Sequence, residues 1–297
     1  MSLSRYGMKS LALLSWCIVM VLLAPLTVTA GSFQLQAQAL GKSGASPSSH
    51  VQATSPGTRL APIEVRPLPP DSRPYGASYG TWGARWWQWA LSAPFGADPI
   101  TDPDGSHCDY GQSGPVWFLA GSSGSTVVRS CTVPAGAALF FPLVNYYANY
   151  PCPPEFGFEP APGQSLEDFL RSFAAGFIDG AANMAVEVDG LSLGDVSSFR
   201  GTSDLFLLDI DPSWQAADPC VTGDPQPAVV DGFWMMLAPL APGAHTLHFH
   251  AEIPAFDFAV DVTYNLTVQP GGRGRGAIDD RPGAETSTWG LVKRLYK

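Results

Sequence analysis

Positive charge is scarce in this sequence. Residues 74–270 contain no lysine and four arginines against 21 acidic residues, which gives this stretch a formal net charge of −17. Proteins bind nucleic acids through clustered lysine and arginine, and anionic membrane surfaces attract the same side chains. The composition therefore argues against both partners, and an acidic surface of this kind favours solubility.

Long apolar runs are also missing. A membrane-spanning helix needs about 20 apolar residues, and the longest run here, residues 10–23, is shorter. It follows a short head with Arg5 and Lys9 and precedes Val-Thr-Ala at residues 28–30. This order is typical of a secretory signal peptide over residues 1–30. We therefore expect a secreted or periplasmic protein whose mature chain has no membrane span.

Cysteines are few. The sequence has five, and four remain once Cys17 in the predicted signal peptide is excluded. Four cysteines in an exported chain indicate two disulfides, with three possible pairings. We expect Cys108–Cys131, closing a short strand–turn–strand unit, and Cys152–Cys220, joining two proline-rich loops. Zinc is the rival interpretation, but no Cys-x-x-Cys spacing supports it.

The aromatic residues divide the chain into three parts. Residues 31–73 are rich in Ser, Ala, Pro and Gln with almost no aromatics, which predicts a disordered linker. Residues 271–297 are rich in Gly and Arg and lack alternation, which predicts a flexible tail. Residues 74–270 hold nearly all the aromatics and the four mature cysteines, and their length suits one domain.

Two helices are predicted. Residues 78–92 place Trp82, Trp86 and Trp89 on one face, with Trp87 elsewhere. Such a stripe packs a helix onto a sheet or, alternatively, forms a platform for sugar rings. The second helix begins after Ser165, whose hydroxyl and an acidic residue three positions later form a capping box.

Short strands dominate the rest of the domain. Hairpin-length links join them, which predicts an antiparallel β-sandwich or jelly roll with two short helices. An Asp-Gly turn at residues 189–190 predicts one hairpin. A Pro-Gly turn at residues 242–243 leads into a strand whose alternating return strand, residues 261–268, resembles the closing hairpin of Ig-like sandwiches. The predicted strands are residues 116–119, 126–133, 138–144, 184–188, 191–193, 205–210, 232–237, 244–252 and 256–268.

A polar aromatic loop is predicted at residues 145–150, directly after an apolar strand. Its side chains, together with Trp87, are our candidate surface for a carbohydrate or another cell-envelope ligand. The candidate ligand-binding residues are Trp87, Asn145, Tyr146, Tyr147 and Asn149.

An acidic loop is a candidate calcium site. Asp98, Asp102, Asp104 and Asp109 could together supply oxygen ligands, which Ca²⁺ prefers. The spacing departs from an EF-hand because Gly105 comes too early and no Glu closes the loop. Asp, Pro and Gly also form ordinary turns, so both interpretations stay open.

A second candidate metal site lies near the C-terminal end of the domain. His248, His250 and Glu252 alternate along a predicted strand and therefore share a face. Two imidazoles and a carboxylate can bind iron, manganese or zinc, and the pattern loosely resembles that of cupins. The carboxylate follows too closely, however, and no later histidine completes the set. Histidines on a sheet surface explain the pattern equally well.

Motifs that would define a reaction are absent. The sequence has no Gly-x-Ser-x-Gly elbow, no phosphate loop and no dinucleotide fingerprint. The leading hypothesis is therefore a non-catalytic extracellular binding module. The alternative is an extracellular enzyme, either metal-dependent or using paired carboxylates on glycans.

Several strings in the domain resemble a group of exported bacterial proteins of uncharacterised function. The resemblance covers residues 75–268 and implies export from a bacterial cell and a single domain, with no activity or site residue attached to it. The strings are CDYGQSGPVWFL at residues 108–119, CTVPAG at 131–136, FFPLVN at 140–145, DGFW at 231–234 and PGAHTLHF at 242–249.

Overall fold

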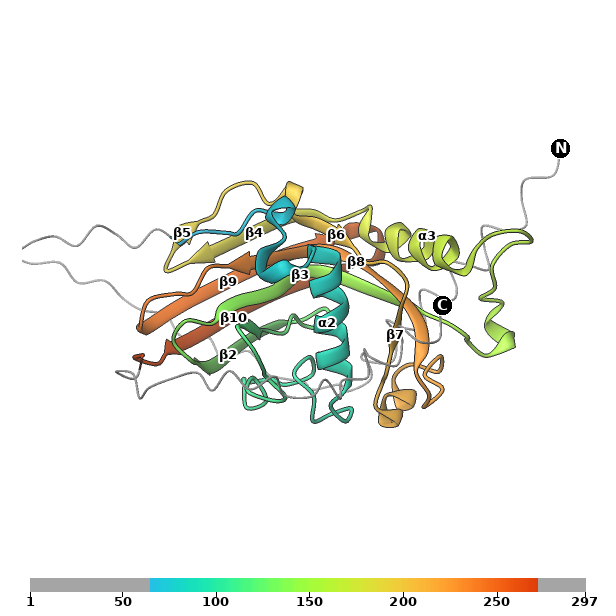
Figure 1. Ribbon diagram of the computed structural model, residues 1–297, viewed down its shortest axis with the longest axis horizontal. Helices are drawn as coiled ribbons and strands as arrows, with labels where there is room; N and C mark the ends of the chain where they lie inside the picture. Colours follow the sequence, from blue (N-terminus) through green and yellow to red (C-terminus); the bar gives the residue numbers. More distant parts are fainter. Residues whose placement is uncertain (1–64, 272–297) are drawn as a thin grey trace, which may run out of the picture.

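A computed structural model of the protein describes residues 65–271 (Figure 1). The predicted signal peptide, most of the predicted linker and nearly all of the predicted tail lie outside the described residues. The described part is mainly β, with two five-stranded sheets, two α-helices and two disulfides. None of its helices is long and apolar enough to cross a membrane.

Sheet A has the strand order β1–β3–β8–β6, and β7 also pairs with β8. The strands are β1 (Val116–Phe118), β3 (Ala138–Asn149), β6 (Arg200–Thr202), β7 (Phe206–Leu208) and β8 (Gln226–Leu237). The loop predicted at residues 145–150 is wrong for all but its last residue. β8 is as long as β3 and offers a partner to each position, from Gly232 opposite Asn145 to Ala228 opposite Asn149.

Sheet B has the order β2–β10–β9–β4–β5. Its strands are β2 (Thr126–Val133), β4 (Ala182–Val188), β5 (Leu191–Ser192), β9 (Gly243–Ile253) and β10 (Phe258–Val268). Two predicted hairpins are confirmed, since β4 pairs with β5 and β9 pairs with β10 in antiparallel register. Asp189 and Gly190 both have positive φ, as the tight turn between β4 and β5 requires.

The prediction of wholly antiparallel sheets is wrong, because both sheets are mixed. β1 pairs with β3 in parallel, and β2 pairs with β10 in parallel over eight positions. The short turn at residues 121–124 does not join paired strands; it carries the chain from β1 in sheet A to β2 in sheet B. A turn signal in the sequence shows where the chain reverses, but not which sheet receives the next strand.

The two sheets share one apolar core. Phe141 of β3 stacks on Phe249 of β9, with ring centroids 4.8 Å apart, and Phe249 stacks in turn on Tyr264 of β10. All three rings are buried, together with the inward aliphatic residues of both sheets. Burial of this apolar surface, at roughly 25 cal/mol per Å², is the main force that holds the sheets together.

Helix α2 (Tyr79–Leu91) packs on the other face of sheet A (Figure 1). Trp82, Trp86 and Trp89 are buried there, so the packing interpretation of the tryptophan stripe is confirmed. Small residues allow the close approach: a Cβ on Gly80 would lie 2.0 Å from the carbonyl oxygen of Thr202 in β6.

Helix α3 (Leu166–Ile178) packs against β3 and β8 and lies to the right of α2 in the view of Figure 1. Ser165 caps its first turn as predicted, because its hydroxyl accepts a hydrogen bond from the Asp168 N–H at 3.1 Å. Leu170 and Ala174 on its inner face are buried against Ala148 of β3 and Val229 of β8.

Both disulfides pair as predicted, Cys108 with Cys131 and Cys152 with Cys220. The end of the predicted linker lies along sheet A at residues 66–68. Pro67 bridges to Leu237, and the Leu68 N–H donates to the Met236 carbonyl at 2.8 Å.

Candidate ligand-binding groove

The outer face of sheet B is polar, and both α-helices pack on sheet A instead. Along β10 the buried residues Val262, Tyr264 and Leu266 alternate with polar residues, of which Asn265 and Thr267 are exposed. This is the pattern of a sheet with one face in the core and the other in solvent.

A hollow of about 370 Å³ lies at one end of this outer face. Its neutral polar lining comes from three adjacent strands. Five neutral polar side chains line it: Ser130 and Thr132 of β2, Thr246 of β9, and Asn265 and Thr267 of β10. All five are exposed, and none makes a side-chain hydrogen bond to another described residue, so their donors and acceptors face solvent.

Strand register sets the spacing of these groups. The parallel pairing places Ser130 beside Asn265 and Thr132 beside Thr267, and the antiparallel pairing places Asn265 beside Thr246. Neighbours across strands lie about 4.8 Å apart, and alternate residues along a strand about 6.7 Å apart. The result is a small grid of hydroxyl and amide groups.

A second hollow of about 500 Å³ adjoins the first, and Ser130 and Thr132 line both. We call the two hollows together the β2 groove. The other residues that line the second hollow are Gly105, Ser106, Cys108, Asp109, Trp117, Pro134 and Gln269.

The loop at residues 104–108 is fastened to β2 and forms one wall of the groove. The Ser130 N–H donates to the Asp104 carbonyl at 2.8 Å, and the Cys108–Cys131 disulfide joins the same two segments. Gly105 has φ +93°, and a Cβ there would lie 2.2 Å from the Ser130 carbonyl oxygen. Only glycine fits this approach.

Asp189 and His245 form the charged end of the first hollow. The imidazole Nδ1 lies 2.7 Å from a carboxylate oxygen of Asp189, and Nε2 lies 2.8 Å from the Ala241 carbonyl oxygen. Both ring nitrogens therefore face acceptors, which favours the doubly protonated ring. Burial acts to lower the pKa of His245, but these two hydrogen bonds and the Asp189 charge outweigh it and raise the pKa.

The predicted calcium residues lie in turns. The Asp98 carboxylate accepts hydrogen bonds from the N–H groups of Gly96, Ile100 and Thr101 and from the Thr101 hydroxyl. Asp102 is likewise surrounded by N–H donors from residues 104, 105 and 107. These contacts fit the turn interpretation.

Asp104 accepts from the Ser106 N–H at 3.0 Å, and Asp109 lines the second hollow. Within residues 65–271, no group of three or more His, Cys, Asp or Glu side chains is arranged to hold a metal ion. The structure therefore does not bring the four aspartates together as a cation site.

His248, His250 and Glu252 do share the outer face of sheet B, beyond the groove, as predicted. Each imidazole is engaged by a carboxylate: His248 Nε2 lies 2.8 Å from Asp261, and His250 Nε2 lies 3.0 Å from Glu252. The three predicted ligands thus form side-chain pairs on a sheet surface rather than converging on one point.

The exposure that we expected for Trp87 is wrong. The side chain is 9% exposed, and its ring packs against Tyr147 with centroids 4.5 Å apart. Asn145, Tyr147 and Asn149 lie on the same face of β3, the face on which α2 packs against Tyr147, and Asn149 is buried.

Tyr146 lies on the opposite face of β3, because neighbouring strand residues alternate. It packs against Phe177 of α3 with ring centroids 4.8 Å apart. The five predicted ligand-binding residues therefore do not form one exposed surface.

Sequence reasoning missed the residues of the β2 groove. The alternation that exposes Asn265 and Thr267 is visible in the predicted strand at residues 256–268. The parallel neighbour that brings Ser130 and Thr132 beside them is not visible, because no local pattern specifies which distant strands pair. Comparison with protein-family models, curated proteins and solved structures gave no match to this chain.

Proposed function

We propose that this protein is a non-catalytic extracellular binding module and that its β2 groove binds a neutral carbohydrate. The observation that carries the proposal is the grid of five exposed, neutral side chains in one hollow. Hydroxyl and amide groups both donate and accept hydrogen bonds, as sugar hydroxyls do. Trp117 in the wall of the second hollow adds aromatic surface of the kind that packs on sugar rings.

Charge supports a neutral ligand. The five grid residues carry no charge, and Asp189 at the end of the hollow is already paired with His245. The surrounding stretch, residues 74–270, has a net charge of −17, which repels polyanions. A neutral oligosaccharide is not repelled by this charge and needs no charged partner in the groove.

Export and architecture are part of the same proposal. A signal peptide at residues 1–30 would send the chain to an oxidising space, and two disulfides suit such a compartment. We place the protein outside a bacterial cytoplasm, secreted or periplasmic. Two sheets around one core suit a β-sandwich or jelly roll, with the groove on the outer face of one sheet.

The test is an array of neutral glycans, followed by titration calorimetry on each hit. The variant N265A/T267A removes two side chains of the grid, and T263A is the matched control on the same face of β10, outside both hollows. We expect the double variant to bind roughly tenfold more weakly, since each neutral hydrogen bond contributes about 0.5–1.5 kcal/mol. T263A is expected to bind like the unaltered protein.

Three results would contradict the proposal. One is an array without a neutral hit, and another is equal affinity of N265A/T267A and the unaltered protein. The third is hydrolysis of a bound glycan, measured as new reducing ends, which would favour the extracellular enzyme instead.

A further inference from the structure

Arg85 of α2 is a half-buried arginine without a carboxylate partner. Within residues 65–271 it makes no ion pair and no side-chain hydrogen bond. Arg171 and Arg200 are also half-buried, and they pair with Glu167 and Asp231, both at 2.7 Å. In a stretch with 21 acidic residues, an unpaired guanidinium is an anomaly that needs a reason.

The guanidinium of Arg85 is held in place by an aromatic ring. Its central carbon lies 4.5 Å from the centroid of the Trp82 ring, a cation–π contact. Trp82 is itself fixed, because its indole N–H donates to the Pro74 carbonyl at 2.9 Å. Burial lowers the pKa of Arg85, and no neighbouring carboxylate opposes that effect. The cation is thus positioned and partly desolvated, without a countercharge.

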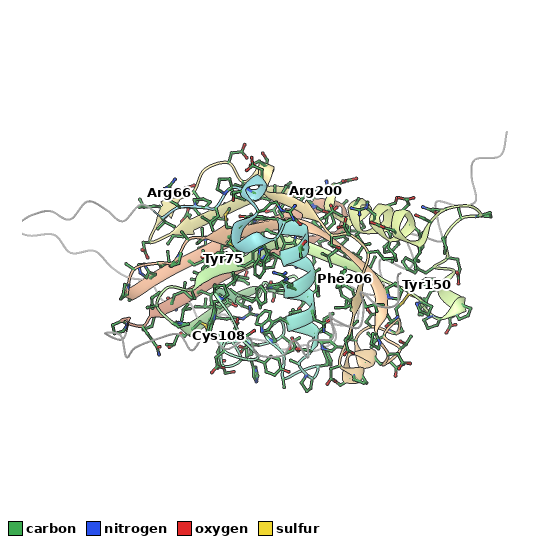
Figure 2. The ribbon with its side chains drawn as sticks, viewed as in Figure 1. Arg66, Tyr75, Cys108, Tyr150, Arg200 and Phe206 are labelled. Atoms are coloured by element: carbon green, nitrogen blue, oxygen red, sulfur yellow. A yellow bond between two sulfur atoms is a disulfide. The ribbon has the colours of Figure 1, made fainter. Side chains whose placement is uncertain are left out.

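An exposed aromatic ring contacts the same Trp82 indole that holds the Arg85 guanidinium. Tyr75, labelled in Figure 2, is 44% exposed. Its ring meets that of Trp82 edge-on, with ring centroids 6.5 Å apart. Its backbone has φ 52°, an unfavourable value for a non-glycine residue. The turn is closed by a hydrogen bond from the Gly76 N–H to the Arg73 carbonyl at 3.0 Å. Tyr75 is therefore held at the surface by its surroundings.

We propose that Arg85, Trp82 and Tyr75 form a binding site for a carboxylate carried on a ring. The planar guanidinium presents paired N–H donors that match the two oxygens of a carboxylate, and the Tyr75 ring offers a face for the ring of the ligand. The net charge of −17 in residues 74–270 selects against anions with several charges. A single carboxylate is therefore preferred to phosphate.

This site is independent of the β2 groove. It lies on α2, which covers sheet A, whereas the groove lies on the outer face of sheet B. Failure of either proposal leaves the other unaffected.

The test follows the Arg85 Nε–H signal by NMR in the full chain at constant ionic strength. The probes are sodium galacturonate, sodium benzoate and inorganic phosphate, and the loss of one signal in R85K gives the assignment. We expect both carboxylates to shift the signal saturably and phosphate to bind roughly tenfold more weakly. A signal that does not shift saturably with either carboxylate overturns the site. Phosphate binding as tight as carboxylate binding overturns the assigned ligand class.

Variants separate the roles of the side chains. R85K keeps the charge but loses the paired donors, and we expect it to bind both carboxylates roughly tenfold more weakly, read from tryptophan fluorescence. Y75A is expected to weaken binding as well, whereas R171K is expected to match the unaltered protein. Equal affinity of R85K and the unaltered protein would overturn the proposal. The titration of the unaltered protein decides the matter even where a variant fails to fold.

Discussion

Arg129 donates a hydrogen bond from Nε to the main-chain carbonyl of Asp102 over 2.7 Å, and both residues are almost completely buried. Burial acts to raise the pKa of the Asp102 carboxyl, but three backbone N–H donors and the Arg129 charge outweigh it, and the pKa is lowered. The other Arg129 donors reach the carbonyls of Ile100, Ala120 and Gly121 and the Tyr264 hydroxyl. One side chain on β2 thus ties the wall of the groove to the core.

Replacing Arg129 with Met is expected to lower the free energy of unfolding by about 3 kcal/mol or more. The change leaves several buried carbonyls without their donor and removes the positive charge near the buried Asp102 carboxylate. The measurement is denaturant unfolding with the disulfides intact. R171Q is the control, since it breaks a half-exposed i,i+4 pair within α3 and should cost less than about 0.5 kcal/mol. Equal losses in the two variants would contradict the structural role of Arg129.

Two helical glycines should respond to alanine in opposite directions. G80A places a Cβ 2.0 Å from the Thr202 carbonyl oxygen, so α2 must move away from sheet A. We expect a loss of about 1–3 kcal/mol in unfolding free energy. At Gly176 in α3, an added Cβ would meet nothing within 4 Å, and G176A should stabilise by about 0.4–1 kcal/mol. Thermal unfolding of both variants checks the pair, and a stabilising G80A would refute the close packing.

Removing either disulfide should destabilise the domain, but only one should affect the groove. On the loop-entropy account, C108S/C131S loses about 3 kcal/mol and C152S/C220S about 4 kcal/mol, since their closed loops differ in length. Cys108 and Cys131 lie in the groove lining, so the first variant should also weaken glycan binding at a temperature where both variants remain folded. Equal glycan affinity in both variants would show that the disulfide does not shape the groove.

The His245–Asp189 contact should make stability depend on pH. The folded state raises the pKa of His245 above its ordinary value of about 6.5, so the folded protein holds that proton more tightly than the unfolded chain does. The resulting stabilisation is complete below about pH 6.5 and is lost as the pH rises through the raised pKa. The lowered pKa of Asp189 acts at the acid end, where its contribution is lost as the pH falls.

Urea unfolding at about pH 5.5 and about pH 8.5 measures this effect. H245Q and D189N should each reduce the difference in unfolding free energy between the two pH values, and both should do so by a similar amount. An unchanged difference in both variants would mean that the contact contributes nothing to the pH dependence.

Metal chelation should leave the fold unchanged. The carboxylates of Asp98 and Asp102 are occupied by N–H and hydroxyl donors rather than directed at a common point. EDTA or excess calcium should therefore shift the midpoint of thermal unfolding by less than about 1 °C, because an ion that does not bind the folded protein does not stabilise it. A saturable rise with calcium would restore the cation interpretation of this loop.

Features that depend on nearby residues were predictable. Ser165 caps the start of α3, the tryptophan stripe of α2 is buried, and residues 189–190 form a tight turn, all as the sequence indicates. The strand alternation at residues 262–268 also gives the correct outward side chains. Each of these depends on capping, helical spacing or turn geometry within a few residues.

The candidate site could not be found in this way. Asn265 and Thr267 belong to a predicted strand, but Ser130 and Thr132 join them only through the parallel pairing of β2 with β10. Trp87 was misplaced for a related reason: the residue that packs on it, Tyr147, belongs to a strand whose predicted end was residue 144 but which continues to residue 149.

By itself, the sequence determined a mainly β domain, its two helices and the presence of two disulfides, because periodicity, capping and an even cysteine count act locally or by simple arithmetic. The tertiary structure alone decided the mixed sheets, the unpaired cation on α2 and the grid in the β2 groove. The physical reason is that each of these requires strands or side chains far apart in the chain to meet, and burial of the whole core selects those meetings.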